Sequence, residues 1–134
     1  MRRVEFTVAG IPAPQGSHKA FMPKGARFPV VTDDNPRTKP WRACVAYAAM
    51  QVRPTPLFDG PVGVAVYFKL PRPKSTPRRV QHPIKRPDCD KLLRAVFDAL
   101  KGVIWHDDSQ VVAISTGKSF GDPGCKVVVW EVEA

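Results

Sequence analysis

The chain has no long hydrophobic run. None of its segments approaches the roughly 18 consecutive apolar residues that a membrane-spanning helix needs. Met1-Arg2-Arg3 leads directly into alternating residues and not into the apolar core of a secretory signal. We therefore expect a cytoplasmic protein with no membrane partner.

Cysteine is scarce, with only Cys44, Cys89 and Cys125 in the chain. An odd number of widely separated cysteines suits neither a disulfide framework nor a zinc knuckle. We expect all three to be reduced thiols.

The length of 134 residues limits the number of domains. It is enough for one hydrophobic core and too short for two ordinary domains. The composition, 43% hydrophobic and 25% charged, is typical of a globular protein. We predict a single domain over residues 1–134, with long loops because the chain has fifteen prolines.

Acidic residues are few and unevenly placed. Twelve acids stand against 21 Lys or Arg residues, which gives a net charge of +9. Residues 1–87 carry +12 and residues 88–134 carry −3. Five acids fall within residues 86–111, namely Asp88, Asp90, Asp98, Asp107 and Asp108. A basic chain attracts polyanions such as nucleic acid, and a local acidic cluster within it indicates a site for a hard divalent cation. This combination is typical of a metal-dependent nuclease.

The most basic segment lies directly before the acidic cluster. Residues 71–87 contain five prolines, six basic residues and no acid, which predicts an exposed loop. Such a run is often only a solvated linker. Its position beside Asp88 favours contact with a phosphate backbone. The candidate DNA-binding residues are Arg72, Lys74, Arg78, Arg79, Lys85 and Arg86, with Lys91 just beyond the loop.

Hydrophobic periodicity predicts an α+β fold. We expect a small mixed β-sheet packed with two or three helices. Strands are expected near residues 2–9, 61–70, 109–118 and 125–133, and helices near 40–52 and 89–101. Thr38 is a plausible cap of the first helix, and Pro54 ends it. The tetrapeptide at 121–124, Gly-Asp-Pro-Gly, predicts a hairpin between the last two strands.

Residues 11–37 are rich in proline and glycine and predict a loop. Its aromatic side chains, Phe21 and Phe28, have two possible roles. They could stack on bases, but pinning the loop to the core is the more common role.

The second helix carries most of the chemistry. Leu92, Leu93, Val96, Phe97 and Leu100 share one face, which predicts a core-facing stripe. Asp88 falls near the N-cap and Asp90 at the edge of the stripe. Taken alone, the two acids are explained by the helix dipole.

Asp107 and Asp108 follow a short apolar segment and could equally be ordinary turn residues. A chain reversal near Gly102 would return them toward the other acidic pair. Two carboxylates about 4 Å apart repel by roughly 4 kcal/mol at an effective dielectric of 20, so either protonation or a cation would be needed to relieve the repulsion. Oxygen ligands without matching His or Cys favour Mg²⁺ or Mn²⁺ over zinc.

The order of residues across this region is specific. It reads Arg86-Pro87-Asp88-x-Asp90-x-Leu92-x-Arg94-Ala95-x-x-Asp98-Ala99-Leu100, then Gly102-Val103-x-x-x-Asp107-Asp108-Ser109-Gln110-Val111. This pattern resembles the RusA-type Holliday-junction resolvases of bacteria and their prophages. The resemblance implies a RusA-like fold and a homodimer that binds four-way DNA during recombination and repair. Each subunit would cut one strand with Mg²⁺, which Mn²⁺ is expected to replace, and no small-molecule substrate is expected.

Carried over by position, the resemblance makes Asp88, Asp90 and Asp108 the metal-binding catalytic carboxylates, with Asp107 as a further metal ligand. One departure concerns the residues after Asp90. The family usually has D-N-L-x-K, so Lys91 replaces an asparagine and Arg94 replaces a lysine associated with catalysis. Arginine keeps the positive charge and could stabilise the transition state, but it cannot act as a base.

The expected reaction is hydrolysis of a phosphodiester by a cation-activated water attacking in line, which leaves a 5′-phosphate and a 3′-hydroxyl. His106 could be a general base, although a lone histidine beside a turn is more often simply exposed.

The main alternative is a non-catalytic basic protein that binds DNA junctions, in which the acids serve only as caps and turns. A PD-(D/E)xK nuclease is less favoured because no acidic-x-Lys triplet follows the acidic pairs at a strand end. An Asp-x-Asp phosphotransferase or glycosyltransferase ranks last because the chain has no glycine-rich phosphate loop.

Overall fold

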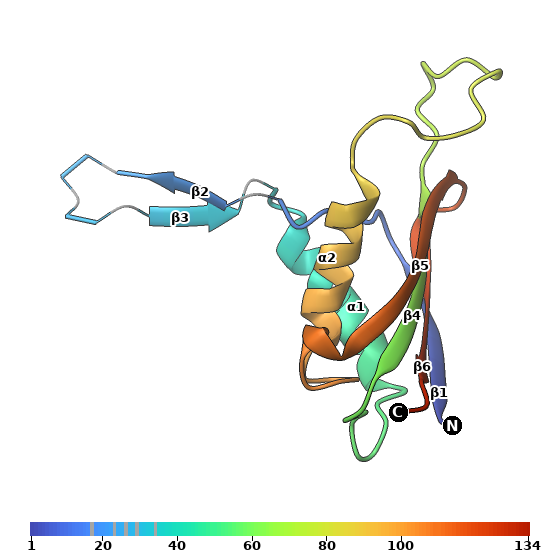
Figure 1. The fold of residues 1–134 in the computed structure, drawn as a ribbon. Coiled ribbons are helices and arrows are strands. Elements are labelled where there is room, and N and C mark those ends of the chain that lie inside the picture. The colour runs from blue at the N-terminus through green and yellow to red at the C-terminus, as the bar shows by residue number, and fades with distance from the viewer. Residues whose placement is uncertain (17, 23, 26, 29, 34) are drawn as a thin grey trace.

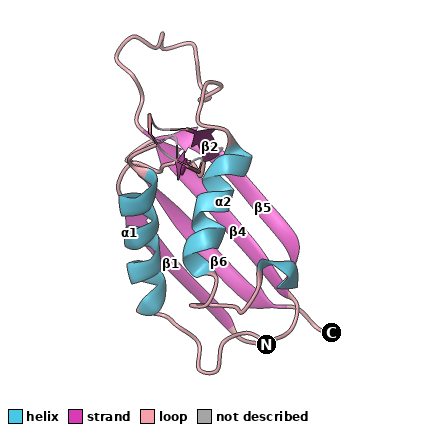
Figure 2. Ribbon diagram, turned by 90° about the vertical axis from the view of Figure 1, so that its left-hand side faces the viewer, coloured by secondary structure: helices cyan, strands magenta, loops and turns pink. Residues whose placement is uncertain are grey.

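A computed structural model of the chain describes residues 1–16, 18–22, 24–25, 27–28, 30–33 and 35–134. Its centre is a four-stranded sheet in the order β1-β6-β4-β5. The strands are β1 (Arg3–Ala9), β4 (Val62–Leu70), β5 (Val111–Phe120) and β6 (Gly124–Glu131). Helices α1 (Thr38–Met50) and α2 (Cys89–Leu100) lie on one face of the sheet (Figure 2). The predicted α+β class is confirmed.

The core lies between this face of the sheet and the two helices. Strand β4 is central and buries Val62, Val64, Val66, Phe68 and Leu70 on one side, as its alternation predicts. From α2, the buried members of the predicted stripe are Leu92, Val96 and Leu100, while Leu93 and Phe97 are half-buried against the core. Helix α1 contributes Trp41, Val45 and Ala49.

Strands β4 and β5 are parallel, and α2 belongs to the connection between them. A parallel pair requires such a crossover, which returns the chain to the starting end of the sheet. Helix α2 therefore begins near the end where β4 and β5 finish, and its C-terminus lies near the end where both strands start (Figure 1).

The predicted hairpin between the last two strands is wrong. β5 and β6 do not pair with each other, because β4 lies between them and pairs with both. Neighbouring strands are about 4.8 Å apart, so a step over one strand covers about 10 Å. The turn at 121–124 reverses the chain as expected, and a turn of four residues is long enough for this step.

The segment predicted as a loop over residues 11–37 contains a two-stranded antiparallel ribbon. It consists of β2 (His18–Phe21) and β3 (Val30–Asp33) and projects away from the body of the molecule (Figure 1). Phe28 does not pin this segment to the core, because its side chain is 75% exposed. The side chain of Phe21 lies outside the part of the chain that the structure describes.

Element boundaries differ from the predictions by a few residues. The first helix begins at Thr38, so Arg37 and not Thr38 occupies the cap position. The Thr38 hydroxyl instead donates a hydrogen bond to the carbonyl of Pro14, 2.7 Å away. Of the last two strands, β5 begins at Val111, two residues later than predicted, and β6 ends at Glu131, two residues earlier than predicted.

The two chain termini lie side by side at the starting end of β4 (Figure 1). The amide of Glu131 donates to the carbonyl of Arg2 at 2.9 Å, and the Arg2 guanidinium pairs with the Glu131 carboxylate at 2.6 Å. Arg2 also lowers the pKa of Glu131 through this hydrogen bond.

All three cysteines are free thiols. Cys125 is buried, and burial raises the pKa of its thiol to about 12. Within the described ranges, no helix has the length and apolar content that crossing a membrane requires.

Candidate carboxylate site and nucleic-acid interface

Asp88 and Asp90 lie at the start of α2. Asp88 occupies the N-cap position with φ −77° and ψ 144°, but its side chain makes no capping hydrogen bond. Asp90 falls in the first turn, and both residues are exposed. The partial positive charge of the helix N-terminus favours both acids. Because Asp88 does not cap the helix, its carboxylate oxygens remain available to a ligand.

Lys118 fixes the chain just before Asp88. Lys118 pairs with the buried Phe68 across the parallel strands and points to the same face of the sheet. Its ammonium donates to the carbonyl oxygens of Lys85 and Pro87 at 2.8 and 2.9 Å. The end of the basic loop is thereby tied to the end of β5, beside the start of α2.

A groove of about 1010 Å³ opens at this end of the sheet. It lies where the parallel strands β4 and β5 end, which is a common place for binding sites in sheets of this kind. Asp88, Lys91 and Phe120 contribute to its lining, together with parts of residues 11–16, 35–37 and 70–87.

The wall formed by residues 11–16 is held by both helices. The amide of Gln15 donates to the carbonyl of Lys91 at 2.9 Å. The Gln15 side chain is buried and accepts a hydrogen bond from Arg42, 3.1 Å away. Arg42 in turn lies 3.7 Å from the carboxylate of Asp98. This network connects the wall of the groove to α1 and α2.

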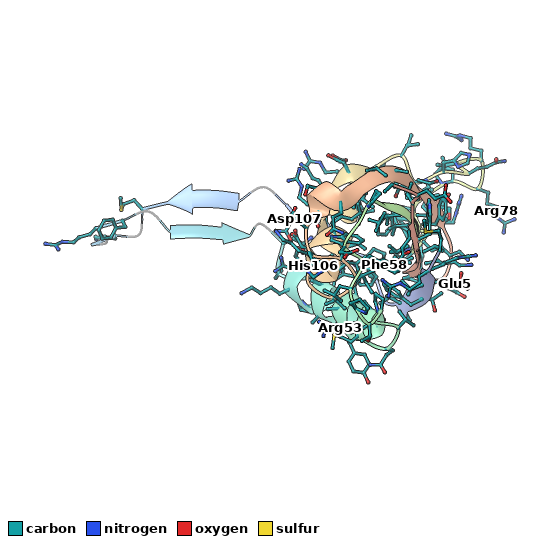
Figure 3. All side chains as sticks on the ribbon, turned by 60° about the horizontal axis from the view of Figure 1, so that its bottom comes forward. Glu5, Arg53, Phe58, Arg78, His106 and Asp107 are labelled. Atoms are coloured by element: carbon teal, nitrogen blue, oxygen red, sulfur yellow. The ribbon has the colours of Figure 1, made fainter. Side chains whose placement is uncertain are left out.

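The predicted DNA-binding residues separate into two groups. Those that line the groove are Lys85, Arg86 and Lys91. The others are exposed on the loop above it, namely Arg72, Lys74, Arg78 and Arg79. Figure 3 shows Arg78 extending outward from the body. Arg72 lies 4.9 Å from the ring centroid of Phe120 and donates to the carbonyl of Pro77.

The second acidic pair belongs to a short 3-10 turn, η1 (Asp108–Gln110), which leads into β5. Asp107 accepts a hydrogen bond from the Ser109 amide at 2.9 Å, and Gln110 completes a reciprocal capping box. The Asp108 carboxylate accepts from the indole nitrogen of buried Trp105 at 2.9 Å. Both carboxylates therefore support the local fold.

The pKa of Asp107 is lowered, first by the backbone hydrogen bond from Ser109, then by the Ser109 side chain and by the charge of Lys101. Since the folded pKa is depressed, the stabilisation from this carboxylate is present above its unfolded pKa of about 4 and is lost as the pH falls through the folded value. The turn η1 is thus expected to loosen in acid.

The two acidic pairs lie at opposite ends of α2. The helix has 12 residues, which at 1.5 Å each span about 18 Å. Asp88 follows the Pro87 carbonyl that Lys118 holds, whereas Asp108 comes before Val111 at the other end of β5. Within the described part of one chain, no three His, Cys, Asp or Glu residues gather into a metal-binding group.

The chain reverses at Gly102, as expected, and φ there is +80°. This reversal does not bring the second acidic pair to the first. It leads the chain only into the turn beside Phe58, because the Phe58 amide donates to the carbonyl of Ile104 at 3.0 Å. Trp105 is fully buried, in agreement with a core role, and His106 is exposed. His106 and Asp107 lie on the surface while Phe58 lies inside the body (Figure 3).

The remaining predicted catalytic residue, Arg94, is exposed on α2, one turn beyond Asp90. Residues four apart lie on the same side of a helix. Its guanidinium can therefore contact an anion that is bound near Asp90.

Sequence patterns do not reveal Lys118 and Arg42 as parts of this region. A signal for Lys118 exists, since a lysine at an inward-facing position of a strand needs a polar partner. The strand register that identifies this position comes only from the fold.

A groove with a basic rim beside exposed carboxylates defines a class of protein that binds a polyanion and can place a cation against it. A family model described as endodeoxyribonuclease RusA matches residues 11–130 of the chain. The chain belongs to this family of endonucleases that act on branched DNA. It is also similar to the Bacillus subtilis (strain 168) protein named "Uncharacterized protein YqaN". The two are 32% identical over an alignment 142 residues long, which covers 98% of each chain.

Proposed function

We propose that this chain is a Mg²⁺-dependent endonuclease that resolves Holliday junctions by paired nicks and acts as a homodimer. The observation that carries the proposal is the uncapped Asp88 carboxylate, which lines a groove with a basic rim at the start of α2. Membership of the family supports endonuclease chemistry on branched DNA.

Asp88 and Asp90 fit the requirements of a magnesium ion. Mg²⁺ in nucleases is commonly held by one or two carboxylates together with substrate phosphate and water. A bound ion supplies positive charge at the phosphate and makes a water molecule more acidic. Mn²⁺ prefers the same oxygen ligands and is expected to replace it.

The cations around this pair hold the DNA strand. Lys85, Arg86 and Lys91 line the groove and contact phosphates on either side of the scissile bond. Arg94 faces the phosphate that is cut and stabilises the charge that develops on its oxygens. Water forms the new P–O bond and loses a proton, while the P–O3′ bond breaks and O3′ gains a proton.

Asp108 and Asp107 keep their proposed role as metal ligands only with the help of the dimer. In one chain the two pairs lie at opposite ends of α2, a helix about 18 Å long. A second copy in the homodimer would have to bring its own η1 to the start of α2. A composite site of this kind would make cutting depend on dimer formation.

The first test is cleavage of a synthetic mobile four-way junction by Asp90→Asn. We expect Mg²⁺-dependent nicks in opposite strands by the unsubstituted protein and none by Asp90→Asn. Junction binding should be unchanged or tighter, because loss of a negative charge eases phosphate approach. Asp59→Asn, an exposed acid outside the groove, is the matched control and should cut normally.

The non-catalytic alternative gives a different result. It predicts tight, salt-sensitive junction binding by both proteins, and no nicks with Mg²⁺ or Mn²⁺. Equal cutting by Asp90→Asn and the unsubstituted protein would remove Asp90 from the catalytic set.

A further inference from the structure

The groove beside Asp88 has an apolar lining that phosphate contacts alone do not explain. Phe120, at the end of β5, contributes an aromatic ring, and Val80 and Ile84 come from the basic loop. Ile84 is 83% exposed, the highest value among the exposed large hydrophobic side chains that the structure describes. Exposed apolar side chains gathered in one concave surface indicate a binding site.

The charged residues in the lining of the groove are almost all cationic. Arg37, Lys85, Arg86 and Lys91 contribute positive charge. Asp88 is the only acid among the lining residues that the structure describes. An apolar surface surrounded by cations matches the chemistry of a single nucleotide, whose base is flat and apolar and whose phosphate is negative.

The loop that carries Ile84 is held in place on both sides. The Lys118 ammonium fixes the carbonyls of Lys85 and Pro87, and the Val80 amide donates to the Pro77 carbonyl at 3.0 Å. The guanidinium of Arg72 lies over the Phe120 ring. The apolar residues of the groove are therefore positioned before any ligand binds.

The groove is also large enough for this ligand. Its volume of about 1010 Å³ lies at the upper end of the roughly 300–1,000 Å³ that is typical of small-molecule pockets. An intact duplex presents stacked and paired bases, and placing one of them in such a groove costs a few kcal/mol of unstacking and unpairing. A base at a branch point leaves the stack at the least cost, because its stacking is already interrupted.

We propose that this groove binds one unstacked nucleotide of the DNA strand at the branch point. The base lies against Ile84, Val80 and Phe120, and its phosphates contact Arg86 and Lys91 beside Asp88. The inference rests on the proposed function and adds how the site distinguishes branched from linear DNA.

The test combines a protein variant with a DNA variant, and it uses binding in EDTA so that no cutting occurs. The protein variant is Ile84→Ser, and the DNA variant is a four-way junction in which the branch-point nucleotides are made abasic one at a time. Ile84→Ser should weaken junction binding on the order of tenfold, as expected for the loss of a base contact. Affinity for linear duplex should not change.

Combining the protein change with the DNA change tests whether Ile84 contacts the base directly. At the nucleotide that enters the groove, the abasic site should weaken binding to the unsubstituted protein and cause little further loss with Ile84→Ser. Ile114→Ser is the matched control, because Ile114 is 52% exposed and lies outside the groove. A second variant, Phe120→Leu, keeps an apolar side chain but removes the ring, and it should reduce the same preference.

The inference is overturned if Ile84→Ser weakens junction and duplex equally, or if every abasic site adds its full loss to that of Ile84→Ser. Failure of the proposed function gives a different result. If the base preference is intact but no Mg²⁺-dependent nicks form, the nucleotide-binding groove is supported and the endonuclease proposal is rejected.

Discussion

At the scale of single residues, Lys118 connects the sheet to the site. Most residues expected to contact DNA are crowded in one basic loop, which makes them recognisable from sequence, but Lys118 stands alone in a strand. Its ammonium holds two carbonyl oxygens just before Asp88, so it acts by positioning the backbone and not by contacting substrate. A positioning residue such as Lys118 is recognised only when the fold shows which groups its inward-facing charge contacts.

We expect Lys118→Met to destabilise the protein by about 1–2 kcal/mol, because two charge-assisted hydrogen bonds are lost while the carbonyls can still bind water. Urea denaturation measures this change. Lys126→Met, an exposed lysine on β6, should shift stability by less than about 0.5 kcal/mol. Equal losses in the two variants would show that the contacts of Lys118 contribute nothing specific.

At the scale of elements, periodicity predicts which segments form strands and helices but not which strands are neighbours. The buried face of β4 and the stripe of α2 follow directly from the spacing of Val, Phe and Leu. The pairing of β4 with both β5 and β6 does not, since turn residues indicate a reversal without indicating the next partner. The β2–β3 ribbon was missed because its strands have four residues each within a segment rich in proline and glycine.

The reversal after α2 depends on one glycine. Gly102 has φ +80° and its amide donates to the carbonyl of Trp105 at 2.7 Å, while no atom lies near the position of an added Cβ. Gly102→Ala should therefore cost about 1–2 kcal/mol from backbone strain alone. Gly60→Ala also meets no neighbour and has no positive φ, so thermal denaturation should show almost no change. A neutral Gly102→Ala would mean that this turn adapts to a different conformation.

At the scale of the whole molecule, sequence order predicts which carboxylates matter but not their distance in space. Asp88 and Asp90 are two residues apart in sequence, and both lie at the start of α2. Asp108 follows 18 residues after Asp90, and the intervening helix carries it to the other end of the sheet. Nothing in the spacing of the motif distinguishes a site within one chain from a site shared by two.

Mixed dimers of Asp90→Asn and Asp108→Asn test whether the carboxylates act across subunits. If two chains share each site, neither variant alone cuts, but a mixed dimer contains one intact site. Random pairing then restores about a quarter of the sites, seen as single nicks in a gel assay of the co-expressed proteins. No recovery in verified mixed dimers would place all the essential carboxylates within one chain.

The neighbouring termini have a practical consequence. Arg2 and Glu131 form an ion pair at the end of the sheet where β4 starts, whereas the groove opens at the end where β4 and β5 finish. A fluorophore or a surface tether attached at either terminus therefore leaves the groove clear. The protein is suited to single-molecule experiments in which its arrival on a branched DNA is observed in real time.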